Sequence, residues 1–355
     1  MLKPQRGAAM LLFKDLELGD VVSQLQIAAN DVAGSEDGQL SRLLPAAAAK
    51  AREIASHWDF MAPGRVIDEL LQDRDAFPGA ADVEGRKRLQ RVAVARLALN
   101  FFQVEDPLPP SVTSLYPEFF RRLAKFVVEG PGERYEEEYF AKDVRYALGL
   151  TVPGGALQFD LLYRIGPKLI LREVNRTKSP LPALSYLRSG GWGRWYNEHL
   201  DLRAMREFNP DGWTAHCARM ADVLVLNPGV LGIVGVGWFY DPAVAENSPT
   251  LAYIQDTQTK YGAFHVRIGT EPHHIQNAIY KSALRRRLYE EGKYLPTCYM
   301  LAWPRAPLIE WAERLKVDPS VGFASSDPVT QPRSAAFSQT RSANVAPPTA
   351  PGPVL

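Results

Sequence analysis

The sequence predicts an α/β fold of the mixed α+β kind, with a helical N-terminal region, a mixed-sheet domain and a disordered tail. Helix-favouring stretches dominate residues 1–130. Short apolar, strand-like runs alternate with helical ones over residues 131–316. Proline, serine, alanine and threonine then dominate residues 317–355, where large apolar residues are too sparse to offset chain entropy.

The bulk composition narrows the class of protein. Lys and Arg number 41 and Asp and Glu number 40, so the net charge of +1 gives no general attraction to nucleic acid or anionic membrane. No apolar stretch reaches the ~18 residues of a membrane span, and the apolar run near the N-terminus is too short for a signal peptide. We therefore expect a cytoplasmic protein.

Cys217 and Cys298 lie far apart, which predicts small buried residues rather than a disulfide or a zinc site.

Four helices are expected before the first strand, three of them within residues 1–130. Leu43–Phe60 is rich in alanine, and Gly85–Gln103 carries apolar residues at helical spacing beside basic ones. Tyr116–Val128 is amphipathic, and Arg134–Leu148 is also helix-forming. The last of these leads into a turn at Pro153-Gly154-Gly155, which marks the start of the strands.

A β-hairpin is expected next, with strands at Leu157–Tyr163 and Lys168–Val174. Arg172–Pro180 is interpreted as a polar, basic loop, either simply exposed or able to clamp a carboxylate or phosphate through arginine. Tyr196–Phe208 and Trp213–Leu226 are predicted to be helical.

The remaining elements follow the order β-β-β-α-β-α. They are strands at Leu231–Tyr240, Leu251–Gln255 and Ala263–Ile268, a helix at Glu271–Glu291, a strand at Thr297–Trp303 and a helix at Pro307–Leu315. Gly235-Val236-Gly237 begins like a dinucleotide fingerprint, but Tyr240 stands where the third glycine belongs. We interpret these glycines as allowing neighbouring backbone to approach a buried strand. The P-loop, HExxH and GxSxG signatures are absent.

Four tryptophans fall within 47 residues of one another: Trp192, Trp195, Trp213 and Trp238. Aromatic side chains gathered beside glycine and ionisable groups either anchor an irregular part of the core or form the walls of a pocket. On the second interpretation, Trp192, Trp195 and Trp238 are candidate substrate-binding residues together with Arg176.

The junction between the strand at Ala263–Ile268 and the next helix is a candidate anion site. Thr270 suits the N-cap of that helix, whose first N–H groups and partial positive charge could hold a phosphate. Arginines on the helix would add positive charge, although arginines also commonly solvate a helix. The candidate cofactor-binding residues are Gly269, Thr270, Arg285, Arg286 and Arg287.

The strand and helix order over Leu231–Leu315 resembles the core of the GNAT-type acyl-CoA N-acyltransferases. The match is topological, because the family's Arg/Gln-x-x-Gly-x-Gly/Ala loop is not present and Arg267-Ile268-Gly269-Thr270 offers one glycine there. The resemblance implies an acyltransferase that moves an acyl group from a thioester donor to a small amine or amino acid. It also implies acyl-CoA as the cofactor.

The same resemblance implies an acid and a base. A tyrosine often protonates the departing thiolate in that family, and Tyr299 would be placed for this role, with Tyr294 as a second candidate. A carboxylate or water commonly deprotonates the amine, and Glu198 and Asp241 are both candidates for that base.

A second enzyme class is suggested by His199 and Asp201. A His-x-Asp pair on a strand, completed by a distant His such as His265, resembles the Fe(II) triad of 2-oxoglutarate oxygenases. The helix expected at Tyr196–Phe208 counts against this hypothesis, as does the absence of an arginine about ten residues after His265. A His199 paired structurally with a carboxylate is the alternative.

A third class is a non-enzymatic protein that binds a ligand or partner in an aromatic pocket. The proline-rich tail over residues 317–355 could dock a protein partner, although a plain solvated tail is the more common use of such a composition. Basic and aromatic residues interleave over Arg285–Trp303, but one short patch in a neutral protein does not favour nucleic-acid binding.

Overall fold

The computed structural model describes residues 10–16, 18–33, 36–55, 59–129 and 137–322. Nearly all of the predicted tail lies outside these residues, because the description ends at residue 322. Among the described residues, no helix is both long and apolar enough to cross a membrane.

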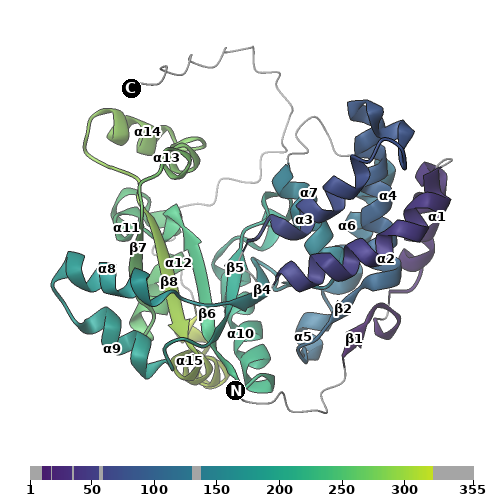
Figure 1. Ribbon diagram of the computed structural model, residues 1–355. Coiled ribbons are helices and arrows are strands. Elements are labelled where there is room, and N and C mark those ends of the chain that lie inside the picture. Colours follow the sequence, from purple (N-terminus) through teal and green to yellow (C-terminus); the bar gives the residue numbers. More distant parts are fainter. Residues whose placement is uncertain (1–9, 17, 34–35, 56–58, 130–136, 323–355) are drawn as a thin grey trace.

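The first part of the chain forms a group of helices beside one end of a sheet (Figure 1). The helices predicted at Gly85–Gln103, Tyr116–Val128 and Arg134–Leu148 are confirmed as α4, α6 and α7. Asp82 begins α4 by accepting a hydrogen bond from Gly85 N, as an N-cap should. The seven helices are α1 (Val21–Ala33), α2 (Asp37–Ile54), α3 (Ala62–Leu71), α4 (Val83–Phe101), α5 (Pro110–Thr113), α6 (Tyr116–Glu129) and α7 (Glu137–Ala147). A short antiparallel pair, β1 (Leu11–Leu12) with β2 (Gln103–Val104), joins them.

A mixed six-stranded sheet follows, which confirms the predicted fold class. Its strands lie in the order β3-β4-β5-β6-β8-β7, and only β5 and β6 run parallel to each other. The strands are β3 (Thr151–Pro153), β4 (Gln158–Tyr163), β5 (Arg194–His199), β6 (Val230–Gly237), β7 (Phe264–Gly269) and β8 (Cys298–Pro304). The parallel pair is joined by α10 (Pro210–Leu226), so β5, α10 and β6 form a β-α-β unit.

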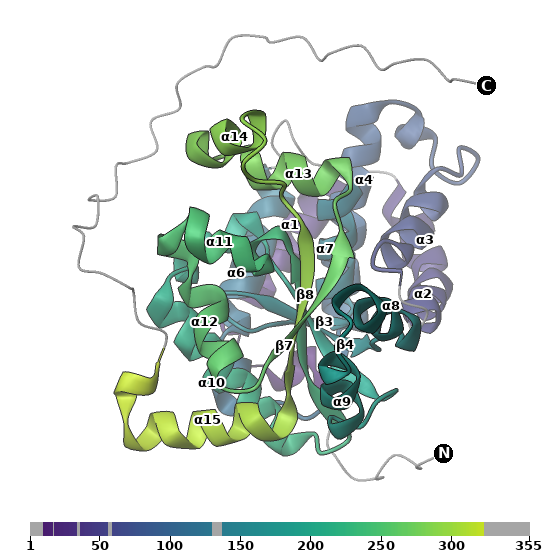
Figure 2. The same ribbon diagram turned by 90° about the vertical axis from the view of Figure 1, so that its left-hand side faces the viewer.

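Helices cover both faces of the sheet (Figure 2). On one face, α8 (Pro167–Thr177) and α9 (Leu181–Arg188) bury a cluster that includes Trp195, Val234 and Met300. On the other face lie α10, α12 (Tyr253–Lys260) and α15 (Arg305–Val317). The core on this second side is continuous with the buried residues of the N-terminal helices.

Three predictions made from short segments were wrong. The strand expected at Lys168–Val174 and the loop expected at Arg172–Pro180 are largely one helix, α8, which Pro167 begins at its first position. The strand expected at Leu251–Gln255 is a helical turn, Pro249–Leu251, followed by α12. A short apolar run fits a strand and the buried face of a helix equally well, so its pattern alone does not predict which one forms. In these segments the helical state is the one that packs against the sheet.

The prediction of a helix at Tyr196–Phe208 was also wrong. Its first residues form β5, which pairs with β4 on one side and with β6 on the other, and a 3₁₀ segment follows at Leu202–Glu207. The helix predicted at Glu271–Glu291 is broken into α13 (Pro272–Ile279) and α14 (Ala283–Glu290), because Ser282 caps α14 through Arg285 N. These two helices project beyond the ends of β7 and β8 (Figure 1).

The outer strand β7 is covered along its backbone by α8. The guanidinium of Arg172 donates to the carbonyl oxygens of Arg267 and Ile268, at 3.1 and 2.8 Å. The carboxylate of Glu173 accepts from Arg267 N at 3.3 Å. These side chains satisfy backbone groups that an edge strand would otherwise present to another chain.

The glycines of β6 make room for close neighbours, but at the two predicted positions, Gly235 and Gly237, these neighbours are the rings of Tyr240 and Phe239 and not backbone. A Cβ at Gly232 would lie 2.3 Å from the carbonyl oxygen of Trp303, so backbone does approach this strand closely. At Gly235 the space is filled by the ring of Tyr240, whose hydroxyl would lie 2.3 Å from a Cβ there. Both positions therefore require glycine for packing.

Candidate active site at the seam between the helices and the sheet

His199, the last residue of β5, is held by a carboxylate from the neighbouring strand. Its Nε2 lies 2.8 Å from Asp160 Oδ2 on β4, and the Nδ2 atom of Asn197 lies 3.0 Å from the same nitrogen. The ring of Phe60 packs against the imidazole with 4.6 Å between ring centroids. The His199 side chain is still 23% exposed, so solvent reaches this position.

Asp160 is itself fixed from the helical region. Arg145 on α7 forms an ion pair with Asp160 at 3.0 Å, and the Thr151 hydroxyl donates to the same carboxylate. Burial alone would raise the pKa of Asp160, but the charges of Arg145 and His199, with hydrogen bonds from His199 and Thr151, lower it to about 2. Asp160 is therefore an anion at neutral pH.

This arrangement gives the two nitrogens of His199 different tasks. Because Asp160 is an anion that accepts, we assign the Nε2 proton to this contact, which leaves the lone pair on Nδ1. An imidazole oriented by a carboxylate is suited to remove a proton from a nucleophile that reaches its other nitrogen.

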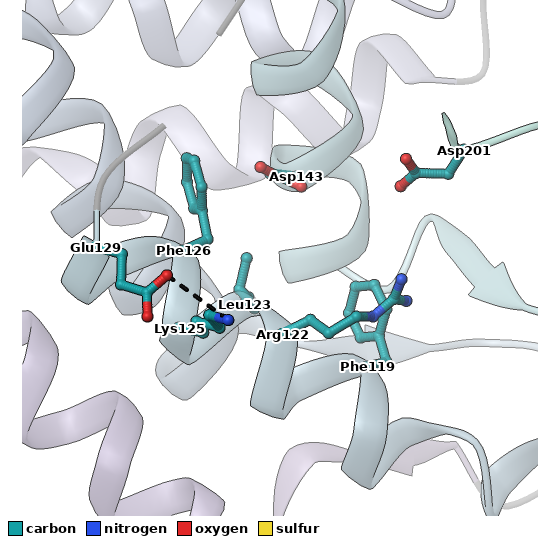
Figure 3. A pocket seen from close by; sticks show the side chains of 8 residues that line it. All are labelled: Phe119, Arg122, Leu123, Lys125, Phe126, Glu129, Asp143 and Asp201. Carbon is teal, nitrogen blue, oxygen red and sulfur yellow. Dashed lines mark ion pairs between the residues drawn. The ribbon is translucent and has the colours of Figure 1, made fainter. Parts of the chain in front are cut away.

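A cavity of about 210 Å³ opens beside the segment that follows β5 (Figure 3). Asp143 on α7 and Asp201 line it, and both residues are buried. Arg122 on α6 contributes a guanidinium, which faces the same space as the two carboxylates (Figure 3). The other lining residues are Phe119, Leu123, Lys125, Phe126 and Glu129.

Gln158 connects the cavity with His199. It lies directly opposite His199 in the β4–β5 pairing, and its Nε2 donates to Asp201 Oδ2 at 3.3 Å. The side chain of Gln158 is therefore a neighbour of both His199 and Asp201, two of the predicted catalytic residues.

Glu198, the candidate base implied by the family resemblance, lies on the opposite face of β5 from His199. Its carboxylate contacts His216 Nε2 at 2.7 Å, and His216 Nδ1 lies 3.0 Å from the carbonyl oxygen of Gly154. His216 is fully buried and the side chain of Glu198 is only 2% exposed, so this pair joins α10 to the sheet away from solvent. The second candidate base, Asp241, accepts from the backbone N–H groups of Ala243 and Thr297.

Tyr299, the predicted acid, lies on β8 between Gly237 on one side and Arg267 on the other. Burial raises the pKa of its hydroxyl, an effect strengthened by Asp241, so the group keeps its proton. Burial also raises the pKa of Tyr294. Arg176, a predicted substrate-binding residue, makes a two-point contact with Glu173 on its own helix.

The predicted cofactor-binding residues lie along β7, α13 and α14. The N-cap of α13 is Glu271, not Thr270 as predicted, because the chain stays extended for one more residue after Gly269. Arg285 packs its guanidinium 4.4 Å from the ring centre of Trp238 and donates to Ala278 O and Ser248 Oγ.

The two neighbouring arginines of α14 have other contacts. Arg286 donates to Tyr280 O at 3.0 Å, and Arg287 lies 3.8 Å from Glu291. A cofactor role for Gly269, Thr270 and these arginines stays a prediction.

The tryptophans do not share a pocket. Trp195 and Trp213 are fully buried, on opposite faces of the sheet, and Trp238 is covered by Arg285. Trp192 is 50% exposed in the bend before β5. The cavity beside Asp201 is not lined by an indole, and Trp195 and Trp213 act as core anchors. A substrate-binding role for Trp192 and Trp238 stays a prediction.

The iron hypothesis lacks its third ligand. His265 pairs with Leu301 on β8, Leu301 pairs with Gly235 on β6, and Gly235 pairs with Glu198, the neighbour of His199. Three strand spacings amount to about 14 Å, which is too far for a shared ion. Across the described part of the chain, no group of three or more His, Cys, Asp or Glu residues could hold a metal.

Sequence reasoning missed the residues that position His199. Asp160 stands between Phe159 and Leu161 in a strand whose neighbours are apolar, and a lone acid in such a run was the available signal. Arg145, Asp143 and Arg122 lie in helices where charged residues usually face solvent, so nothing local marked them.

Comparisons with known proteins give one weak similarity. No family model matches the sequence, and no curated protein matches it. Among solved structures, the chain is similar to the crystal structure of an acyltransferase mutant in complex with octanoyl-CoA, with 12% sequence identity and a TM-score of 0.40. The match covers 85% of this chain and 91% of that chain. A similarity of this size supports no conclusion about the fold, the site or the activity of this chain.

Proposed function

We propose that this chain is an acyltransferase-like enzyme that moves an acyl group from a thioester donor to a small amine or amino acid. The observation that carries the proposal is the contact of 2.8 Å between His199 Nε2 and Asp160 Oδ2, at a position that solvent reaches. An amine becomes a nucleophile only after it loses a proton, and an oriented imidazole supplies that step.

The proposed reaction balances as a simple substitution. The amine nitrogen forms a bond to the thioester carbonyl carbon, and its proton passes to His199 Nδ1. The carbon–sulfur bond breaks, and the departing thiolate takes a proton from water, because the strand pairing puts Tyr299, the predicted acid, on the face of the sheet opposite His199. The products are an amide and a free thiol.

The donor would lie at the carboxyl end of the parallel strands β5 and β6. Ligands commonly bind at this edge of parallel strands, and the helix that connects them presents its N-terminus there. In this chain that helix is α10, which Asn209 caps through Gly212 N. The alternative position for the donor, predicted from the sequence, is the junction between β7 and α13 at Gly269.

The test is thiol release from short- and medium-chain acyl-CoA thioesters, measured with and without a mixture of amino acids and simple amines. We expect amine-dependent release by the wild-type protein and a loss of at least about a hundredfold in His199→Gln, since a positioned base contributes ~10²–10⁴. Asp75→Asn, at an exposed position in the turn after α3, is the control and should keep the full rate. Amine-independent release, or equal rates in both variants, would contradict the proposal.

A further inference from the structure

We infer that the outer surface of α8 and α9 binds an anionic lipid bilayer. Its leucine side chains would enter the acyl-chain region, and its lysine and arginine side chains would meet the lipid phosphates. This surface, the α8–α9 face, consists of the exposed side chains of residues 167–188. The inference is independent of the proposed function, because binding to a bilayer requires no reaction.

Four leucines of the α8–α9 face are turned toward solvent. Leu171, Leu181, Leu184 and Leu187 are 60%, 67%, 43% and 66% exposed. The three on α9 follow one another at intervals of three residues, so they lie on one side of this helix, opposite the buried Tyr186. Single exposed leucines are common on protein surfaces, whereas several on two neighbouring helices indicate contact with an apolar partner or with a membrane.

The two helices hold these leucines outward in advance. α8 and α9 pack against each other and form the outermost layer on their side of the sheet (Figure 1 and Figure 2). Their inward side chains, Ile170 and Tyr186, belong to the core under this face of the sheet, and the Tyr186 hydroxyl donates to Ile165 O at 3.1 Å. Because the helices are fixed from inside, binding through their outer side requires little ordering of the chain.

Positive charge surrounds the leucines. Residues 161–193 hold six Lys and Arg residues and one acidic residue, Glu173, which pairs with Arg176. Four exposed cations form no ion pair with any residue that the structure describes: Arg164, Lys168, Lys178 and Arg188. The net charge of +1 for the whole chain hides this local excess. The rest of the molecule is therefore net negative, so an anionic bilayer would attract this face in particular.

The backbone at Lys178 gives a separate observation. This residue ends α8 in the left-handed conformation, with a φ of 56°. Glycine and asparagine adopt this conformation most readily. The Lys178 side chain is exposed, so packing does not account for a lysine at this position. A contact between its ammonium group and a lipid phosphate does account for it.

Charge also distinguishes a bilayer from other occupants of this face. A second copy of the chain would bring cations against cations, and residues 323–355 carry two arginines and one aspartate, so neither offers the negative charge required. Leucines interleaved with lysine and arginine are typical of surface helices that lie at a bilayer interface. There the aliphatic stems of the basic side chains are buried beside the leucines while their charges reach the phosphates.

The experiment is cosedimentation of the purified full chain with vesicles of two compositions, phosphatidylcholine alone and phosphatidylcholine mixed with phosphatidylglycerol. We expect binding to the mixed vesicles to be at least about tenfold tighter, because each basic residue near an anionic surface strengthens binding severalfold. The triple variant Lys168→Gln, Lys178→Asn and Arg188→Gln should bind the mixed vesicles at least about tenfold more weakly. The double variant Leu181→Ser and Leu187→Ser should weaken this binding by a similar factor, because it removes apolar contact.

Matched controls come from the N-terminal helices. Lys50→Gln removes an exposed cation from α2, and Ile27→Ser removes an apolar side chain that is 60% exposed on α1. Both should bind the mixed vesicles as the wild type does. Circular dichroism checks that each variant folds. If a multiple variant unfolds, Lys178→Asn alone keeps the test available, because asparagine suits the left-handed turn and the variant should still bind severalfold more weakly.

Three results would overturn the inference. The first is a wild-type protein that does not bind the mixed vesicles, or that binds neutral vesicles equally well. The second is a folded triple or double variant that binds as the controls do. The third is retention on immobilised polyglutamate without binding to the vesicles, which would identify an acidic protein as the partner of this face.

Discussion

At the scale of single residues, Asp160 links the chemistry of the site to the stability of the protein. Its pKa in the folded protein is about 2, below the ordinary value of 3.8. A lowered carboxyl pKa contributes stability that is fully present above the unfolded value and is lost as the pH falls through the folded value. The protein should therefore lose about 2 kcal/mol of unfolding free energy from this group between about pH 4 and pH 2.

Chemical denaturation of the wild type and of Asp160→Asn across this range measures the effect. Asp160→Asn should be less stable at pH 7, and its stability should depend less on pH below 4. Equal slopes for the two proteins in that range would show that Asp160 is not paired as described.

His265 makes the stability of the protein depend on pH in a second range, above that of Asp160. Burial lowers the pKa of its imidazole to about 4, against a smaller opposing effect of Glu173. Between about pH 6.5 and pH 4 the unfolded chain binds this proton and the folded chain does not, so stability falls as the pH falls. Replacing His265 by Gln should reduce the change of the denaturation midpoint with pH between pH 7 and pH 5. An equal pH dependence in the variant and the wild type would show that His265 titrates normally.

Residue-level reasoning named His199 and Asp201 but not their partners, and a catalytic role for these two residues stays a prediction. A His-x-Asp pair is visible as a pattern, whereas Asp160 approaches His199 only because β4 and β5 pair in one register. Arg145 reaches Asp160 from α7, a contact that no local pattern encodes. The pairing of a histidine with a carboxylate, one of the two interpretations of His199, is confirmed.

At the scale of elements, α8 protects the edge of the sheet. Arg172→Ala removes two hydrogen bonds to β7 carbonyls, so we expect a loss of about 1 kcal/mol and more self-association of the exposed edge. Lys168→Ala, on an exposed position of the same helix, is the control and should change neither property. Denaturation and light scattering measure both effects, and identical behaviour of the two variants would remove this role from Arg172.

Long elements with a clear period were predictable, and short ones were not. α4, α6 and α10 show helical spacing over 14 or more residues, and β8 was also found. The failures at α8 and β5 are segments of 11 and 6 residues, whose state depends on what they pack or pair against. The parallel β5–β6 pair was missed for the same reason.

At the scale of the whole molecule, Arg52 ties the helical region to the chain that leads into the sheet. From α2 its guanidinium donates to the carbonyl oxygens of Phe101, Gln103 and Leu148. Arg52→Met should lower the unfolding free energy by about 3 kcal/mol, because three partly buried carbonyl groups lose a charged donor. Arg42→Met, exposed on the same helix, should cost less than about 0.5 kcal/mol. Urea denaturation measures the free energy of unfolding of both variants, and equal losses in the two would contradict this role of Arg52.

The account as a whole depends on His199 acting as a base. The most direct measurement is the rate of acyl transfer by His199→Ala with and without added imidazole, using the amine or amino acid that gives the wild-type protein its fastest thiol release. The account predicts a fall of at least about a hundredfold and a partial recovery that grows with imidazole concentration, because the free base then occupies the vacated space. Transfer by His199→Ala at the wild-type rate without imidazole would contradict it.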